Sequence, residues 1–130
     1  MDKQNQSKGM EEGFAEDLYY FVNMCGKEDR KIFQYPNRKK PVEQYARLIC
    51  AAMALGLRGA MLRLFNLWGE ERLDELFRCL DGWTFEEVKR HIEAFIAGVE
   101  HPLFKQAAEE TWLERQKTLS AENFKIRNLL

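Results

Sequence analysis

Apolar side chains recur every three or four residues along most of this chain, the period of an α-helix packed against a core. No run shows the strict apolar–polar alternation that is typical of a half-buried strand. The pattern therefore predicts an all-α fold, a single-domain helical bundle of five to six helices. The predicted helices span residues 11–25, 41–55, 60–68, 70–80, 84–98 and 103–118, and a last short helix is expected within residues 121–130.

The second predicted helix has a different pattern from the others. Its apolar residues extend into the longest apolar run of the chain, Leu48 to Leu57, which is apolar on every side of a helix. A membrane span needs about 20 such residues, so this run is too short to cross a bilayer. We therefore expect Val42 to Leu55 to form the central, buried helix of the bundle, and no membrane partner.

Local signals in the sequence indicate the start of one helix and the start of the folded domain. Thr84 is followed three residues later by Glu87, the spacing of a capping box, and this predicts the start of a helix there. Residues 1–9 are polar and have no helical period. We expect them to be a disordered tail, and residues 10–130 to form the single helical domain.

Composition narrows the class of protein. The chain has 130 residues, of which 45% are hydrophobic, enough for one domain with its own core. Its three cysteines, Cys25, Cys50 and Cys79, are far apart, and each lies in an apolar helical pattern. This is typical of reduced, buried thiols. Because no secretory signal is visible either, a cytoplasmic location is expected.

The motifs that carry enzyme chemistry are absent from the sequence. Neither histidine follows a glutamate by three residues, as a di-iron bundle requires, and no Cys-x-x-Cys or glycine-rich phosphate loop occurs. We interpret His91 as a solvated surface residue and His101 as a residue that ends a helix. The sequence therefore predicts no catalytic residues, no metal and no cofactor.

Charge is unevenly distributed, although the net charge is only -1. Residues 27–63 carry nine basic and three acidic side chains, while the segments before and after are acidic. Many of the basic side chains lie in the connection between the first two predicted helices, with two aromatic residues among them. These residues predict a site for nucleic-acid backbone or another polyanion: Arg30, Lys31, Phe33, Tyr35, Arg38, Lys39, Lys40 and Arg47.

Two other interpretations of the basic connection remain open. The same side chains would suit an acidic protein surface, or the connection could be a solvated loop that Phe33 and Tyr35 anchor to the bundle. The chain end poses a similar question, because four apolar residues there either fold onto the bundle or dock a partner or a second copy of the chain. These residues are Phe124, Ile126, Leu129 and Leu130.

The sequence thus favours a non-enzymatic small helical subunit or adaptor of a larger assembly, which contacts nucleic-acid backbone or another polyanion through the basic, aromatic connection. The alternative is a protein–protein binder, such as an inhibitor, immunity or regulatory protein, that makes no nucleic-acid contact.

Overall fold

Among the residues that the computed structural model describes, all regular structure is helical, which confirms the predicted all-α class. The structure describes residues 15–34, 42–119 and 124–129, so the predicted tail lies outside the described residues. Residues 15–24 form the N-terminal helix. The other elements are α2 (Lys27–Gln34), α3 (Val42–Ala54), α4 (Arg58–Trp68), α5 (Leu73–Asp81), α6 (Phe85–Ala97) and α7 (Pro102–Gln116), with short 3-10 helices η1 (Glu70–Arg72) and η2 (Ile126–Leu129).

The number of helices is slightly higher than expected. Within the described ranges there are seven α-helices rather than five or six, and the additional one is α2, where the sequence indicated a connection. At the chain end, the expected short helix is limited to the 3-10 helix η2 among the described residues. Of the helices described, none combines the length and apolar character that crossing a membrane would require.

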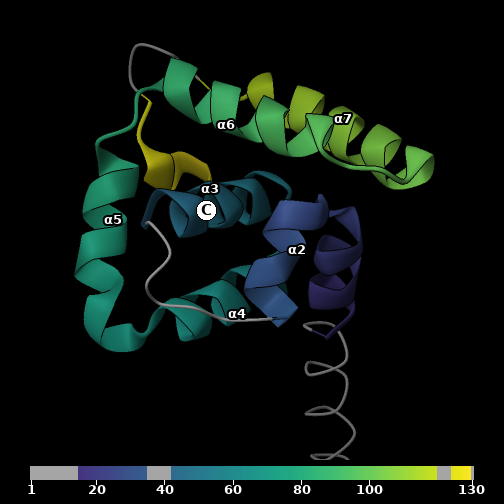
Figure 1. The fold of residues 1–130 in the computed structure, drawn as a ribbon. Coiled ribbons are helices and arrows are strands. Elements are labelled where there is room, and N and C mark those ends of the chain that lie inside the picture. Colours follow the sequence, from purple (N-terminus) through teal and green to yellow (C-terminus); the bar gives the residue numbers. More distant parts are fainter. Residues whose placement is uncertain (1–14, 35–41, 120–123, 130) are drawn as a thin grey trace, which may run out of the picture.

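Helix α3 lies in the middle of the bundle, as predicted (Figure 1). It packs against α4, α5 and α6, and every residue from Leu48 to Ala54 is buried. Four of its last five residues before the turn at Leu55 are alanine or cysteine, and such small side chains allow neighbouring helices to approach closely. Helix α7 runs along the outside of α6, so it contributes less to the core.

Stacked aromatic rings join the outer helices to this centre. Phe21 of the N-terminal helix stacks on Phe95 of α6 with the ring centroids 5.2 Å apart. Trp68 at the end of α4 packs on Tyr45 of α3 with a centroid separation of 4.8 Å. All four side chains are almost completely buried, so each pair contributes both buried area and ring contact.

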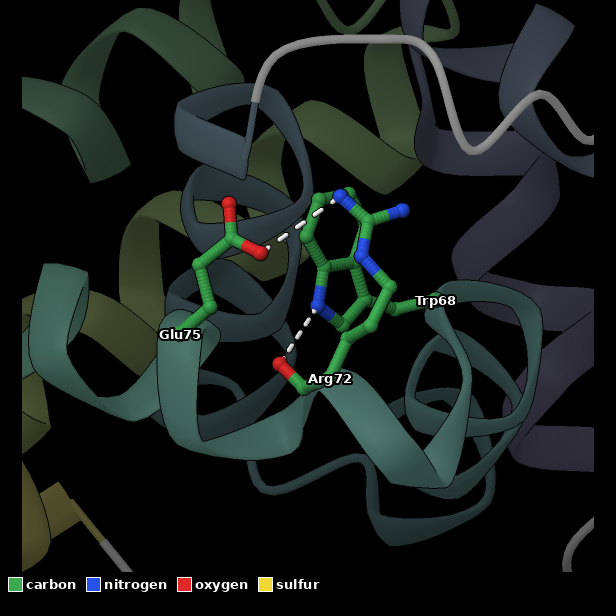
Figure 2. A network of polar contacts seen from close by, with 3 residues as sticks. All are labelled: Trp68, Arg72 and Glu75. Carbon is green, nitrogen blue, oxygen red and sulfur yellow. Dashed lines mark hydrogen bonds and ion pairs between the residues drawn. The ribbon is translucent and has the colours of Figure 1, made fainter.

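A polar network fixes the corner between α4 and α5 (Figure 2). The Trp68 indole Nε1 donates to the Arg72 carbonyl oxygen at 2.9 Å, which satisfies a polar group that is otherwise buried. The Arg72 guanidinium lies across the indole, 4.0 Å from the ring centroid, and its Nη2 is 3.5 Å from Glu75 Oε2. Trp68 therefore joins the core to the turn that redirects the chain.

The predicted helix start at Thr84 is confirmed. Thr84 is the N-cap of α6, and its side-chain oxygen accepts a hydrogen bond from the Glu87 backbone N–H at 3.2 Å. The two side chains also contact each other, with Thr84 Oγ1 and Glu87 Oε1 3.3 Å apart. The prediction that His101 ends a helix is wrong, because α6 ends at Ala97 with Gly98 as its C-cap. His101 is instead the N-cap of α7, where its Nδ1 accepts from the Leu103 N–H.

Replacing Thr84 with alanine is expected to lower the free energy of unfolding by about 1 kcal/mol, because the Glu87 N–H loses its capping acceptor. Urea denaturation followed by circular dichroism would measure this. The control is Thr111→Ala, which removes an exposed mid-helix hydroxyl that bonds to the Ala107 carbonyl, and which should leave stability unchanged or slightly higher. Equal losses in both variants would contradict the capping role.

One glycine is required where two chain segments cross. A Cβ on Gly26, between the N-terminal helix and α2, would lie 3.0 Å from the carbonyl oxygen of Gly98 at the end of α6. That oxygen belongs to the backbone, so it cannot move aside as a flexible side chain could. The absence of a side chain at Gly26 thus lets the start of α2 pack against the end of α6.

Candidate polyanion-binding face

Helix α2 presents a cationic stripe, which we call the α2 basic face: Lys27, Arg30, Lys31 and Gln34. These positions are spaced three, one and three residues apart, so they share one side of a helix. Together with Glu100, they line a pocket of about 370 Å³. The α2 basic face is thus concave, with three cationic side chains around one space.

The opposite side of α2 holds it on the bundle. Ile32 is buried, and the Phe33 ring packs edge-on against Phe21 with the ring centroids 5.9 Å apart. Glu28 and Asp29 in the first turn suit the positive end of the helix dipole. An isolated helix of eight residues would be marginal in water, so this inward packing is what stabilises α2.

The cationic groups of the face are only partly engaged within the chain. Arg30 donates from Nη2 to the Cys25 carbonyl oxygen at 3.2 Å, while its buried Nε has no acceptor among the described residues. Lys31 pairs with Glu28 at 3.1 Å, but both side chains are largely exposed. Such a pair is worth well under about 1 kcal/mol, so the Lys31 ammonium can exchange Glu28 for another anion at little cost.

Arg47 has a different role from the one the sequence suggested. From α3 it donates to the carboxylate of Asp29 on α2. Asp29 is only 7% exposed and is the one buried charged residue of the described part of the chain. Arg47 therefore compensates the buried charge of Asp29 and holds α2 against α3. Its guanidinium is bonded to Asp29, although part of the side chain is exposed to solvent.

The structure thus divides the predicted polyanion site. Arg30 and Lys31 lie on the α2 basic face, whereas Phe33 is partly buried and packs against Phe21 on the other side of α2. The other four predicted residues of the basic connection, Tyr35, Arg38, Lys39 and Lys40, lie outside the described residues. Lys27 and Gln34 were missed, although their helical spacing from Arg30 and Lys31 was visible in the sequence.

The predicted docking residues at the chain end fold back on the bundle where they are described. Ile126 and Leu129 are buried, with 3% and 2% of their surface exposed. The half-buried Phe124 ring packs against Phe85, with centroids 5.3 Å apart, and the Arg115 guanidinium donates to the Leu129 carbonyl oxygen. Ile126 and Leu129 are therefore not exposed to a partner, and Leu130 lies outside the described residues.

Burial changes the proton affinity of His91 and of two cysteines, Cys25 and Cys50. The His91 ring is half-buried and stacks on Trp83 at 4.1 Å. Burial, with Arg47 and Arg90 nearby, lowers the pKa of His91 from its usual value. Burial also raises the pKa of the Cys25 thiol, and that of Cys50 to about 12. These two thiols stay protonated at neutral pH and are weak nucleophiles.

The described side chains favour anion binding over metal binding. Where the structure describes the chain, no three His, Cys, Asp or Glu side chains are grouped so that they could hold a metal ion. What the α2 basic face can do is bind anions, through lysine point charges and the arginine fork. No known protein family, curated protein or solved structure matches this chain.

Proposed function

We propose that this chain is a non-enzymatic subunit or adaptor that contacts nucleic-acid backbone, or a similar polyanion, through the α2 basic face. One observation supports this above all: Lys27, Arg30 and Lys31 line the same concave pocket. Phosphate is well matched to such a set, because lysine and arginine both neutralise its charge and donate charge-assisted hydrogen bonds to its oxygens. The three cysteines are free, with Cys25 and Cys50 buried and Cys79 partly exposed, and free cysteines suit a reducing compartment such as the cytoplasm.

The surrounding sequence extends the positive charge beyond one phosphate. Gln34 is followed within six residues by Arg38, Lys39 and Lys40, so residues 27–40 hold six basic and two acidic side chains. Binding to a nucleic-acid backbone draws on several such charges, because each neutralised phosphate releases counterions. Glu100 at the pocket edge opposes the positive charge, which favours weak binding without sequence preference.

The proposal is tested by fluorescence anisotropy with labelled single- and double-stranded DNA and RNA across a salt series. We expect binding that weakens steeply with salt and is similar for unrelated sequences. In the Lys27→Glu/Lys31→Glu variant, affinity at low salt should fall at least about tenfold, and the salt slope should become shallower by about two. The triple reversal of Arg38, Lys39 and Lys40 to Glu tests the adjoining segment in the same way.

A matched control keeps the change in net charge the same. Lys117→Glu/Lys125→Glu reverses two exposed lysines that lie away from the α2 basic face, so it should bind nearly as well as the unaltered chain. Equal losses in the two double reversals would reduce the effect to overall charge and contradict a defined face. No binding at low salt would contradict the proposal as a whole.

A protein partner is the second candidate function, and one observation favours it. Leu103 and Leu113 on α7 are 69% and 62% exposed, and Leu113 borders a groove of about 480 Å³ between α6 and α7. An exposed leucine beside a groove, with a second exposed leucine on the same helix, is typical of a surface for a protein. A partner that stays bound after nuclease treatment, and is lost in Leu103→Lys/Leu113→Lys, would support this function over the first.

A further inference from the structure

A second pocket in the described residues is separate from the α2 basic face and differs from it in chemistry. It has a volume of about 530 Å³ and lies where the end of α3, the start of α4, the last part of α7 and η2 meet. Pockets that take small molecules have volumes of roughly 300–1,000 Å³. The pocket is thus large enough for a small ligand, and its walls decide which kind.

Most of the wall is flexible and apolar. Met53 of α3 faces the pocket together with Leu57, Met61 and Leu62 at the start of α4. Methionine side chains are unbranched and adapt to irregular apolar shapes. Leu62 is 45% exposed, so the apolar wall continues to the solvent-facing opening. Such a surface suits a flexible hydrocarbon chain, and gives few partners to the polar groups of a sugar or a nucleotide.

Two arginines supply the polar part of the wall. Arg58 at the start of α4 is exposed, and Arg115 reaches the pocket from α7. Arg115 donates to the Leu129 carbonyl oxygen, which holds its guanidinium in place, while its buried Nε has no acceptor among the described residues. None of the residues that line the pocket is acidic, so the two positive charges are not compensated by any lining residue.

The start of α4 adds to this positive field. Leu57 is the N-cap of α4, and its side chain makes no capping hydrogen bond. The first N–H groups of a helix without a side-chain cap are donors at the positive end of the helix dipole. Leu57 and Arg58 both line the pocket, so this helix end, Arg58 and Arg115 all favour one anionic group at the mouth of an apolar space.

We propose that this pocket binds a medium-chain fatty-acid carboxylate, one molecule per chain. The carboxylate accepts hydrogen bonds from Arg58, whose fork matches its two oxygens, and is also attracted by the positive charge of Arg115, while the alkyl chain packs along Met53, Met61 and Leu62. An uncharged amphiphile would leave the arginines without an anion, and a multiply charged polar ligand would leave the apolar wall in water. The proposal does not rest on polyanion binding, since α2 contributes nothing to this pocket.

Isothermal titration calorimetry with decanoate, below its micelle concentration, tests the proposal. We expect one site per chain, and binding at least about tenfold tighter than that of decanol, because the charge-assisted hydrogen bonds are lost with the alcohol. From hexanoate through octanoate to decanoate, affinity should rise about threefold to fourfold for each added methylene that is buried. Equal affinity for decanoate and decanol would overturn the proposal, and so would no binding of either.

A single variant with a matched control tests the arginine contact. Arg58→Gln should weaken decanoate binding about tenfold and leave decanol binding unchanged. Arg63→Gln changes another exposed arginine of the same helix that does not line the pocket, so it should bind decanoate like the unaltered chain. Both arginines are exposed, and neither variant is expected to unfold. Identical affinities of the two variants would contradict the site.

The methionines allow the ligand to be located without any substitution. With methyl-labelled methionine, decanoate should shift the NMR signals of Met53 and Met61 and leave that of Met24 in place, because Met24 is buried outside the pocket. Shifts confined to other methionines would place the ligand elsewhere and overturn the assignment.

Discussion

Replacing Trp68 with alanine is expected to lower the free energy of unfolding by about 4 kcal/mol, the largest loss expected from any single substitution considered for this chain. The indole is completely buried and packs on Tyr45 of α3. Its removal leaves a cavity beside the central helix and takes away the donor for the Arg72 carbonyl and the ring beneath the Arg72 guanidinium (Figure 2). Urea denaturation followed by far-ultraviolet circular dichroism measures the loss.

Two further variants separate the contributions of the indole. Trp68→Phe keeps an aromatic ring but loses the hydrogen bond from Nε1 to the Arg72 carbonyl, so it should cost about 1–2 kcal/mol. Trp83→Ala removes an indole that is only half-buried and should cost less than Trp68→Ala. If Trp68→Ala proved no more destabilising than Trp83→Ala, the indole would not be central to the fold.

Replacing Arg47 with alanine is expected to cost about 3 kcal/mol, because it leaves the Asp29 carboxylate buried without its counter-charge. The loss lies at the low end of the range for buried pairs, since the Arg47 side chain is 30% exposed and water screens part of the interaction. The carboxylate is on α2, so the variant should also weaken polyanion binding by disturbing the α2 basic face. Chemical denaturation and anisotropy measure the two effects.

A double-mutant cycle tests whether the pair acts as a unit. In Asp29→Ala/Arg47→Ala neither charge is left unpaired, so the loss of stability should be smaller than the sum of the two single losses. Arg90→Ala removes an exposed arginine of α6 and should cost no more than about 0.5 kcal/mol. Strict additivity of the two single losses would show that Arg47 and Asp29 do not stabilise each other.

The sequence predicts well those parts of the fold that are determined by residues close together in the chain. The apolar run that begins at Leu48 offers no polar side, so the central position of α3 and the burial of Leu48 to Ala54 follow from hydrophobicity. Thr84 and Glu87 cap α6 through hydrogen bonds between residues three apart. The first prediction depends only on the hydrophobicity of the run itself, and the second on two residues three apart. A local sequence pattern is therefore enough to predict both features.

The parts that were missed depend on partners distant in the sequence. Asp29 and Arg47 are 18 residues apart, and no local pattern signals that they meet. Phe33 was expected either to contact a polyanion or to anchor the connection to the bundle, and its partly buried ring packs on Phe21 of another helix, a contact that no local pattern reveals. This is also why α2 was expected to be a connection: its few apolar residues are too weak a signal without the bundle they pack against.

The crossing of Gly26 with Gly98 has a consequence for how this fold can diverge. The two glycines are not equivalent, because a Cβ on Gly98 would meet its neighbours at 3.4 Å or more, whereas one on Gly26 would meet the Gly98 oxygen at 3.0 Å. Position 98 therefore accepts alanine at ordinary contact distances, whereas alanine at position 26 requires the backbone at Gly98 to give way by a few tenths of an ångström. A descendant that acquired a side chain at position 26 would shift the start of α2 away from the end of α6, and the cationic residues of α2 would move with it although none of them had mutated.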